Sequence, residues 1–93
     1  MAPEEIKSHQ RRDRTLLKWL EKDDKYYFKE IKGVCLIMYK NKIYIPDTLK
    51  HKIMEWYHDY LIHPGTTRML ESIQTIMMWH GIREDISKYV KII

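Results

Sequence analysis

The apolar positions of the N-terminal half of the chain follow a strand pattern. Apolar and β-branched runs at 26–31, 34–39 and 43–45 predict three short strands, because such side chains fit a pleated sheet. The polar residues Lys40-Asn41-Lys42 separate the second run from the third, and Asn41 tolerates a positive φ. These two runs therefore predict a β-hairpin, which Pro46 ends because it lacks a backbone donor.

After Pro46 the apolar residues recur at three- and four-residue spacing, which is typical of one helix face. We expect a first helix to about residue 60 and a second capped by Thr66 or Thr67, with Asp47 or Thr48 capping the first. A third helix follows Gly81. The positions predicted to face inward are Leu49, Ile53, Trp56, Tyr57, Tyr60, Leu70, Ile73, Ile76, Met77, Ile82, Ile86, Tyr89, Val90 and Ile93.

The first residues lack any such period. Residues 1–14 are polar and basic, so we expect a frayed or disordered arm. Residues 15–45 then form an N-terminal extension that begins with a short helix and contains the hairpin, and residues 46–93 form the helical domain. The sequence thus predicts an α+β fold, a small β-hairpin extension followed by a three-helix bundle.

Length and composition limit what such a chain can do. Its 93 residues are too few for a complete nucleotide-binding sheet or nuclease core. The 17 Lys and Arg against 13 Asp and Glu give a net charge of +4, which is compatible with nucleic acid and equally with an ordinary soluble domain. The single cysteine, Cys35, excludes an intrachain disulfide framework, and we expect it to be a small buried side chain in a strand. We expect no membrane span, no secretory signal and an intracellular location.

His58 and His63 are the sharpest chemical feature. Two neutral imidazoles at the end of a helix and in the following break can converge on one zinc ion, but a structural zinc site needs two further donors. His80 is one candidate for a third donor. Alternatively, the two histidines are capping or surface residues without a metal.

The string His58-Asp59-Tyr60-Leu61-Ile62-His63-Pro64-Gly65, with Arg68, Trp79-x-Gly81-Ile82 and Tyr89-Val90 after it, resembles the zinc-binding segment of integrases from gypsy-type LTR retrotransposons. The resemblance implies a His-His-Cys-Cys helical bundle with a helix-turn-helix-like pair. It also implies a non-catalytic module that contacts the ends of the element's DNA and helps integrase to multimerise. The catalytic domain is separate in that family, so we expect no enzyme activity.

The chain departs from the family pattern at the metal ligands. When the family pattern is aligned on the two histidines, its first cysteine falls at Ile93 and its second beyond it. Zinc is implied for the complete family domain, but two of the ligands are missing here. We therefore expect a domain that is cut off or degenerate. Met69 also replaces the threonine that is usual in the family.

Basic and hydroxyl side chains of the predicted helices are candidates for phosphate contacts, although solubilising charges would have the same pattern. These candidates are Lys50, Lys52, Thr66, Thr67, Arg68, Arg83, Lys88 and Lys91. The aromatic residues Trp56, Tyr57, Tyr60 and Trp79 could stack on bases, but their helical spacing favours the core.

The sequence thus predicts a non-catalytic integrase module, with DNA and other integrase domains or copies as partners and no small-molecule substrate. By resemblance it would be found in a cytoplasmic virus-like particle and in the nucleus. The alternative is a degenerate or domesticated copy that acts only in protein–protein interaction, without zinc or DNA.

Overall fold

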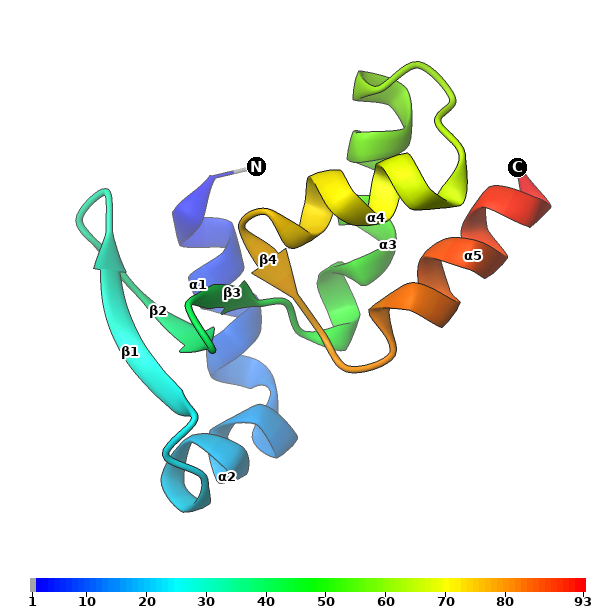
Figure 1. Cartoon of the computed structure of the whole chain (residues 1–93). Coiled ribbons are helices and arrows are strands. Elements are labelled where there is room, and N and C mark those ends of the chain that lie inside the picture. The colour runs from blue at the N-terminus through cyan, green and yellow to red at the C-terminus, as the bar shows by residue number, and fades with distance from the viewer. Residues whose placement is uncertain (1) are drawn as a thin grey trace.

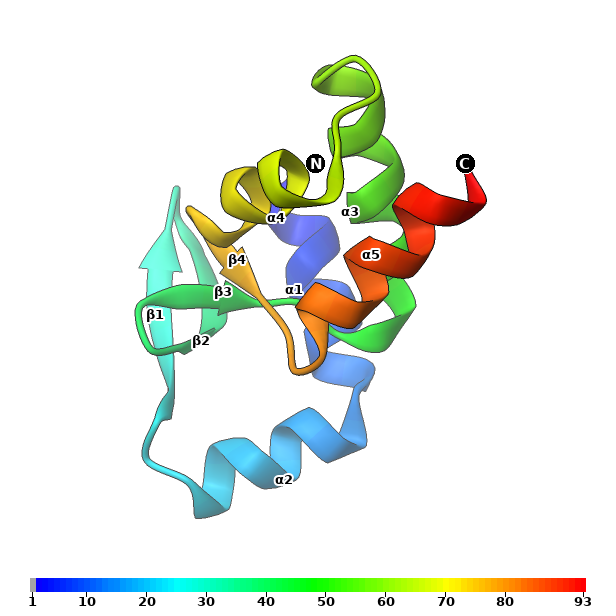
Figure 2. The ribbon, with the colours of Figure 1, turned by 45° about the vertical axis from the view of Figure 1, so that its right-hand side comes forward.

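The computed structural model, which describes residues 2–93, confirms the α+β class with a hairpin followed by helices (Figure 1). Along these residues the elements are α1 (Pro3–Arg12), α2 (Arg14–Lys22), β1 (Tyr26–Ile31), β2 (Val34–Tyr39), β3 (Lys42–Tyr44), α3 (Asp47–Tyr60), α4 (Thr66–Gln74), β4 (Met77–Met78) and α5 (Ile82–Ile92). The three predicted strands and the three helices after Pro46 are all present. In both views α3, α4 and α5 lie on one side of the molecule and the sheet on the other (Figures 1 and 2).

Two tight turns connect the antiparallel strands β1, β2 and β3. Lys32 and Gly33 join β1 to β2 with φ of 51° and 79°, and Lys40 and Asn41 join β2 to β3 with φ of 48° and 68°. Two consecutive positive φ values match the right-handed twist of the flanking strands. The hairpin predicted at Asn41 is therefore confirmed.

The sheet contains a fourth strand that the sequence pattern did not reveal. β4 pairs in parallel with β3, aligning Ile43 with Met77 and Tyr44 with Met78, so the strand order is β1-β2-β3-β4. The predicted helix does not extend through Ile76 and Met77, because α4 ends at Gln74; Met77 is buried as expected, but Ile76 is 48% exposed. The backbone of the extension and that of the helical domain thus share one sheet.

The expectation of a frayed N-terminal arm is wrong for its described residues, since α1 is an ordered helix; Met1 lies outside the described residues. Fully buried Gln10 explains the order. Its amide donates to the carbonyl oxygens of Ile37 at 3.0 Å and Tyr44 at 2.7 Å, and its side-chain oxygen accepts from the Ile37 N–H at 2.9 Å. The side chain satisfies backbone groups that would otherwise be buried without partners.

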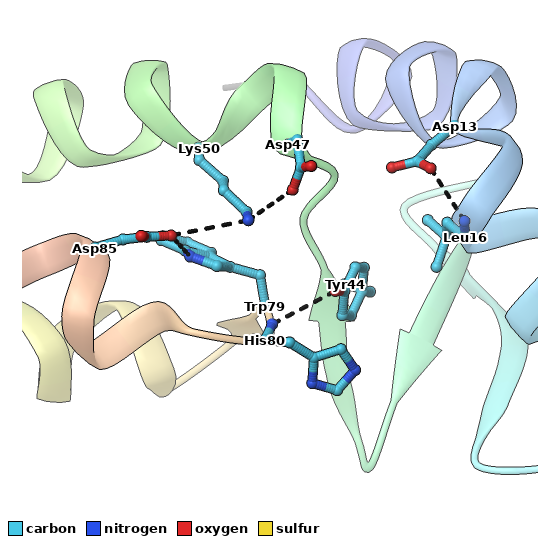
Figure 3. Close-up of polar contacts among 8 residues, drawn as sticks. All are labelled: Asp13, Leu16, Tyr44, Asp47, Lys50, Trp79, His80 and Asp85. Carbon is cyan, nitrogen blue, oxygen red and sulfur yellow. Dashed lines mark hydrogen bonds and ion pairs between the residues drawn. The ribbon is translucent and has the colours of Figure 1, made fainter.

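The helix caps also differ in part from the prediction. The N-cap of α2 is Asp13, whose carboxylate accepts a hydrogen bond from the Leu16 N–H at 3.0 Å (Figure 3). The N-caps of α3 and α4 are Pro46 and Gly65, each one residue before the first of the expected caps, Asp47 and Thr66, so the predicted side-chain caps are wrong.

A polar chain joins α3 to α5 (Figure 3). The buried Trp79 indole N–H donates to the Asp85 carboxylate at 2.8 Å, and Lys50 lies 3.8 Å from the same carboxylate and 2.6 Å from Asp47. Asp85 is half-buried at this position, because a buried indole needs an acceptor.

An aromatic cluster joins the extension to the turn before α5. The His80 ring lies 5.2–6.3 Å from the ring centroids of Trp19, Tyr26, Tyr39 and Tyr44. His80 Nε2 also hydrogen-bonds the Tyr26 hydroxyl at 2.6 Å, and its backbone N–H contacts the Tyr44 hydroxyl at 3.4 Å. The cluster therefore fixes the position of α2 and β1 relative to the helical domain.

Candidate metal centre

The C-terminal end of α3 explains why the two histidines are five residues apart. The His63 N–H donates to the His58 carbonyl at 3.0 Å, and the Ile62 N–H donates to the Asp59 carbonyl at 3.2 Å. This pair of bonds is the Schellman motif, which requires a left-handed residue just after the helix. Ile62 fills that position with φ of 60°, and His63 follows with φ of 54°. The motif folds the chain back so that His63 returns to His58.

The two imidazole rings consequently lie together. Their centroids are 4.8 Å apart with an interplanar angle of 71°. His58 is buried, with 5% of its surface exposed, and its ring packs 5.8 Å from Tyr89 of α5, whereas His63 is exposed to solvent. One imidazole of the pair is therefore buried and the other is accessible to solvent.

Two histidines would supply two of the four ligands of a tetrahedral zinc site. Among the described residues, no group of three or more His, Cys, Asp or Glu side chains is placed to hold a metal ion. Ile93 lies one helical turn beyond Tyr89, and its N–H donates to the Tyr89 carbonyl at 3.1 Å. The position where the register expects a cysteine thus continues the helix end that packs on His58, but isoleucine has no donor atom.

The other candidate donors lie elsewhere. His80 belongs to the aromatic cluster and bonds Tyr26, so it is not the third ligand of the pair. Cys35 is exposed in β2, and the expectation that it is buried is wrong. Its neighbours on the strand, Val34 and Leu36, are buried, because successive side chains of a strand face opposite sides of the sheet.

The predicted phosphate-contacting residues differ in accessibility. Thr67 and Arg68 of α4 and Arg83, Lys88 and Lys91 of α5 are exposed, whereas Thr66 is half-buried. The Lys50 side chain is 21% exposed and is engaged by Asp47 and Asp85, so little of it is available to a phosphate. Lys52 forms an ion pair with Glu5 of α1 but remains 59% exposed.

The aromatic residues of α3 differ from the favoured prediction that they lie in the core. Trp79 is fully buried as predicted, but Trp56 is 49% exposed and Tyr60 is 68% exposed. Tyr57 is half-buried, and its burial raises the pKa of its hydroxyl. The core face of α3 turns through Leu49, Ile53, Met54 and His58 instead. Helical spacing alone did not distinguish the centre of the apolar face from its edge.

The comparison with protein families identifies the domain. The model of the integrase zinc-binding domain matches residues 45–92, just over half of the chain, and the chain therefore belongs to this family. The match begins at the end of β3 and includes both histidines and all of α3, α4 and α5. The family's domain is a non-catalytic N-terminal domain of integrase.

No curated protein matches the chain, and no solved structure does either. Among the described helices, none is long and apolar enough to cross a bilayer.

Proposed function

We propose that this chain is the non-catalytic N-terminal module of a retrotransposon integrase, which contacts the DNA ends of the element and takes part in integrase assembly. The observation that carries the proposal is the close pair of His58 and His63, held by a strained turn inside the matched segment 45–92. Non-glycine residues with positive φ cost free energy and persist where the surrounding structure or function requires them. In this role the chain acts in the virus-like particle and in the nucleus.

His58 and His63 supply the histidine half of a structural zinc site in this proposal. The metal would fasten the turn after α3 to the end of α5, which already packs on His58 through Tyr89. The two remaining donors are not among residues 2–93. Because zinc affinity depends on four ligands, we expect the chain alone to bind zinc weakly.

The proposed DNA surface comprises the start of α4 and the outer face of α5. Thr66, Thr67 and Arg68 lie in the first turn of α4, where backbone N–H groups favour a phosphate. Arg83, Lys88 and Lys91 are exposed on α5, which packs against α4. Lys50 contributes less, because Asp47 and Asp85 already engage it, and Lys52 lies on α3, outside this surface.

The test is the salt dependence of binding to duplex DNA that carries the ends of an element. We expect affinity to fall steeply with salt, and the double variant Lys88→Ala/Lys91→Ala to lower the slope of log affinity against log salt by about 1 to 2, since each neutralised phosphate contributes about 0.9. Lys32→Ala/Lys40→Ala, in the turns of the sheet, is the matched control. Binding that is insensitive to salt, or equal loss in both double variants, would contradict the proposed surface.

A second candidate function is a protein-interaction module that uses neither zinc nor DNA. The exposed Trp56 and Tyr60 favour it, because large aromatic side chains are enriched at protein interfaces. Absence of DNA binding at low salt together with an unchanged melting temperature on addition of zinc would support this candidate over the first.

A further inference from the structure

A strip of exposed side chains runs along the C-terminal half of α3. Lys52, Trp56, Asp59 and Tyr60 share one helix face, since residues three or four apart are neighbours on a helix surface. The rings of Trp56 and Tyr60 stack with centroids 5.0 Å apart and planes 12° apart. In both views this end of α3 stands out from the rest of the molecule (Figures 1 and 2). The stack is thus a fixed aromatic surface that faces solvent.

An apolar pocket adjoins this strip. It has a volume of about 170 Å³ and is lined by Ile53, Trp56, Tyr57, Ile76 and Met77. Ile76, in the turn between α4 and β4, is itself 48% exposed. A pocket of this kind accommodates one apolar or aromatic side chain, and aromatic anchors in such pockets contribute much of the binding energy of protein interfaces. The strip and the pocket together form what we call the α3 patch.

The charges of the α3 patch are complementary to themselves. Lys52 lies one helical turn before Trp56, and Asp59 lies three residues after it. If two copies pack with their α3 helices antiparallel about a two-fold axis beside Trp56, Lys52 meets Asp59 of the partner subunit. Twofold symmetry produces this ion pair twice, with the Trp56 rings of the two copies between the two pairs.

We propose that the α3 patch is a self-association surface through which a second copy of this chain binds. The inference rests on the proposed function for the role of self-association in integrase assembly, while the surface is assigned from the exposure, stacking and charges of α3. Lys52 is 59% exposed beside Glu5, so it remains accessible to a second carboxylate. Asp59 and Glu55 on the same end of α3 would repel a phosphate backbone, which argues against DNA as the occupant.

One helix face is small compared with the roughly 800 Å² per partner of a stable interface. We therefore expect a weak dimer of the isolated chain, with a dissociation constant in the micromolar-to-millimolar range. Sedimentation equilibrium over that range of concentrations measures the constant directly.

A charge exchange tests the orientation. Asp59→Lys alone sets two lysines against each other at both symmetric positions, and Lys52→Asp alone sets two aspartates, so each variant should be monomeric. A mixture of the two variants places an opposite pair at both positions, and dimerisation should return; the double variant Lys52→Asp/Asp59→Lys should dimerise as well. Glu84→Lys, on the exposed face of α5, is the control and should leave the dimer unchanged.

The aromatic contribution has its own variant. Trp56→Ser should weaken dimerisation at least about tenfold, which corresponds to about 1.4 kcal/mol. Phe28→Ser removes an aromatic side chain of 50% exposure from β1 and should leave the dimer intact. Circular dichroism and melting curves establish that each variant is folded.

Four outcomes would overturn the inference. The first is that the chain stays monomeric at every concentration, and the second is that the single charge-reversal variants dimerise like the original chain. The third is that a mixture of the two single variants stays monomeric. If Trp56→Ser weakens DNA binding and leaves the mass unchanged, the α3 patch is a nucleic-acid surface and the inference also fails. If the chain binds DNA in a salt-dependent way but does not dimerise, only this inference is rejected. If the chain dimerises but does not bind DNA, only the DNA contact of the proposed function is rejected.

Discussion

The backbone N–H of His63 donates a hydrogen bond to the carbonyl oxygen of His58 at 3.0 Å, and this bond closes the turn at the end of α3. It links the third-last residue of the helix to the second residue after its C-cap, as the Schellman motif requires. Four residues necessarily lie between them. The spacing of the two histidines is therefore a consequence of how the helix ends, and the imidazoles are brought together before any metal is added.

Ile62 carries the strain of this turn, and glycine should relieve it. A left-handed conformation costs an L-residue about 1–2 kcal/mol, which glycine avoids. Glycine in turn costs about 0.5–1 kcal/mol in backbone entropy on folding. Because Ile62 is 80% exposed, its side chain contributes little burial. We expect Ile62→Gly to raise the free energy of unfolding by up to about 1 kcal/mol in thermal or urea unfolding.

The control for this variant is Ile92→Gly, which replaces an isoleucine of 84% exposure at the end of α5. Its backbone is helical, so glycine should destabilise the chain slightly or leave it unchanged. If Ile62→Gly destabilises the chain as much as Ile92→Gly does, the strain assigned to Ile62 is absent.

His63→Ala should abolish the weak metal binding of the chain with little effect on its stability, because His63 is exposed. Titration with cobalt(II) or zinc(II), followed by absorbance or by calorimetry, measures this affinity. His51→Ala, an exposed histidine on α3 whose ring lies 5.5 Å from Tyr89, is the matched control and should bind as the original chain does. Equal affinities for all three proteins would remove the histidine pair as a metal site.

A thiol at position 93 should strengthen the site. In a Cys35→Ser background, Ile93→Cys adds a donor one turn beyond Tyr89, and we expect cobalt affinity to rise at least about tenfold with a thiolate-to-cobalt absorption band. Ile92→Cys places the same thiol about 100° away around the helix and should give a smaller gain. A larger gain at 92 than at 93 would refute the register.

Gln10→Ala should be among the most destabilising substitutions in the chain. It leaves the Ile37 N–H and the carbonyls of Ile37 and Tyr44 buried without their present partner. Each unsatisfied buried group costs about 1–3 kcal/mol, so we expect a loss of at least about 3 kcal/mol in urea unfolding. Gln74→Ala, at an exposed position of α4, should change stability by less than about 1 kcal/mol. Equal small effects would show that Gln10 does not hold α1 on the sheet.

Alkaline pH should loosen the aromatic cluster. Burial, followed by the nearby Tyr44 and Tyr39, raises the pKa of Tyr26 to about 12 from the ordinary value of 10.0. Between these values the folded chain keeps a proton that the unfolded chain has lost, so stability is full below pH 10 and falls as pH rises toward 12. The melting temperature should drop over this range, and less steeply for Tyr26→Phe. Equal slopes for the two proteins would contradict the prediction.

The sequence alone determined the strands β1, β2 and β3, the hairpin turn and the approximate positions of α3, α4 and α5. Their signals are local: β-branched runs, Asn41 in a tight turn, and the breaks at Gly65 and Gly81. It also identified the histidine pair and the family, because both depend on spacing along the chain. Local signals predict local structure well, since the interactions that favour them span only a few residues.

Tertiary structure alone decided the remaining features. Gln10 orders α1 only because Ile37 and Tyr44, distant in sequence, supply backbone partners. Met77 and Met78 form a strand because β3 offers an unpaired edge, and a two-residue strand has no period of its own. Trp56 is exposed because neighbouring elements cover only part of α3. Each depends on contacts between segments far apart in the chain, which no periodicity within one segment encodes.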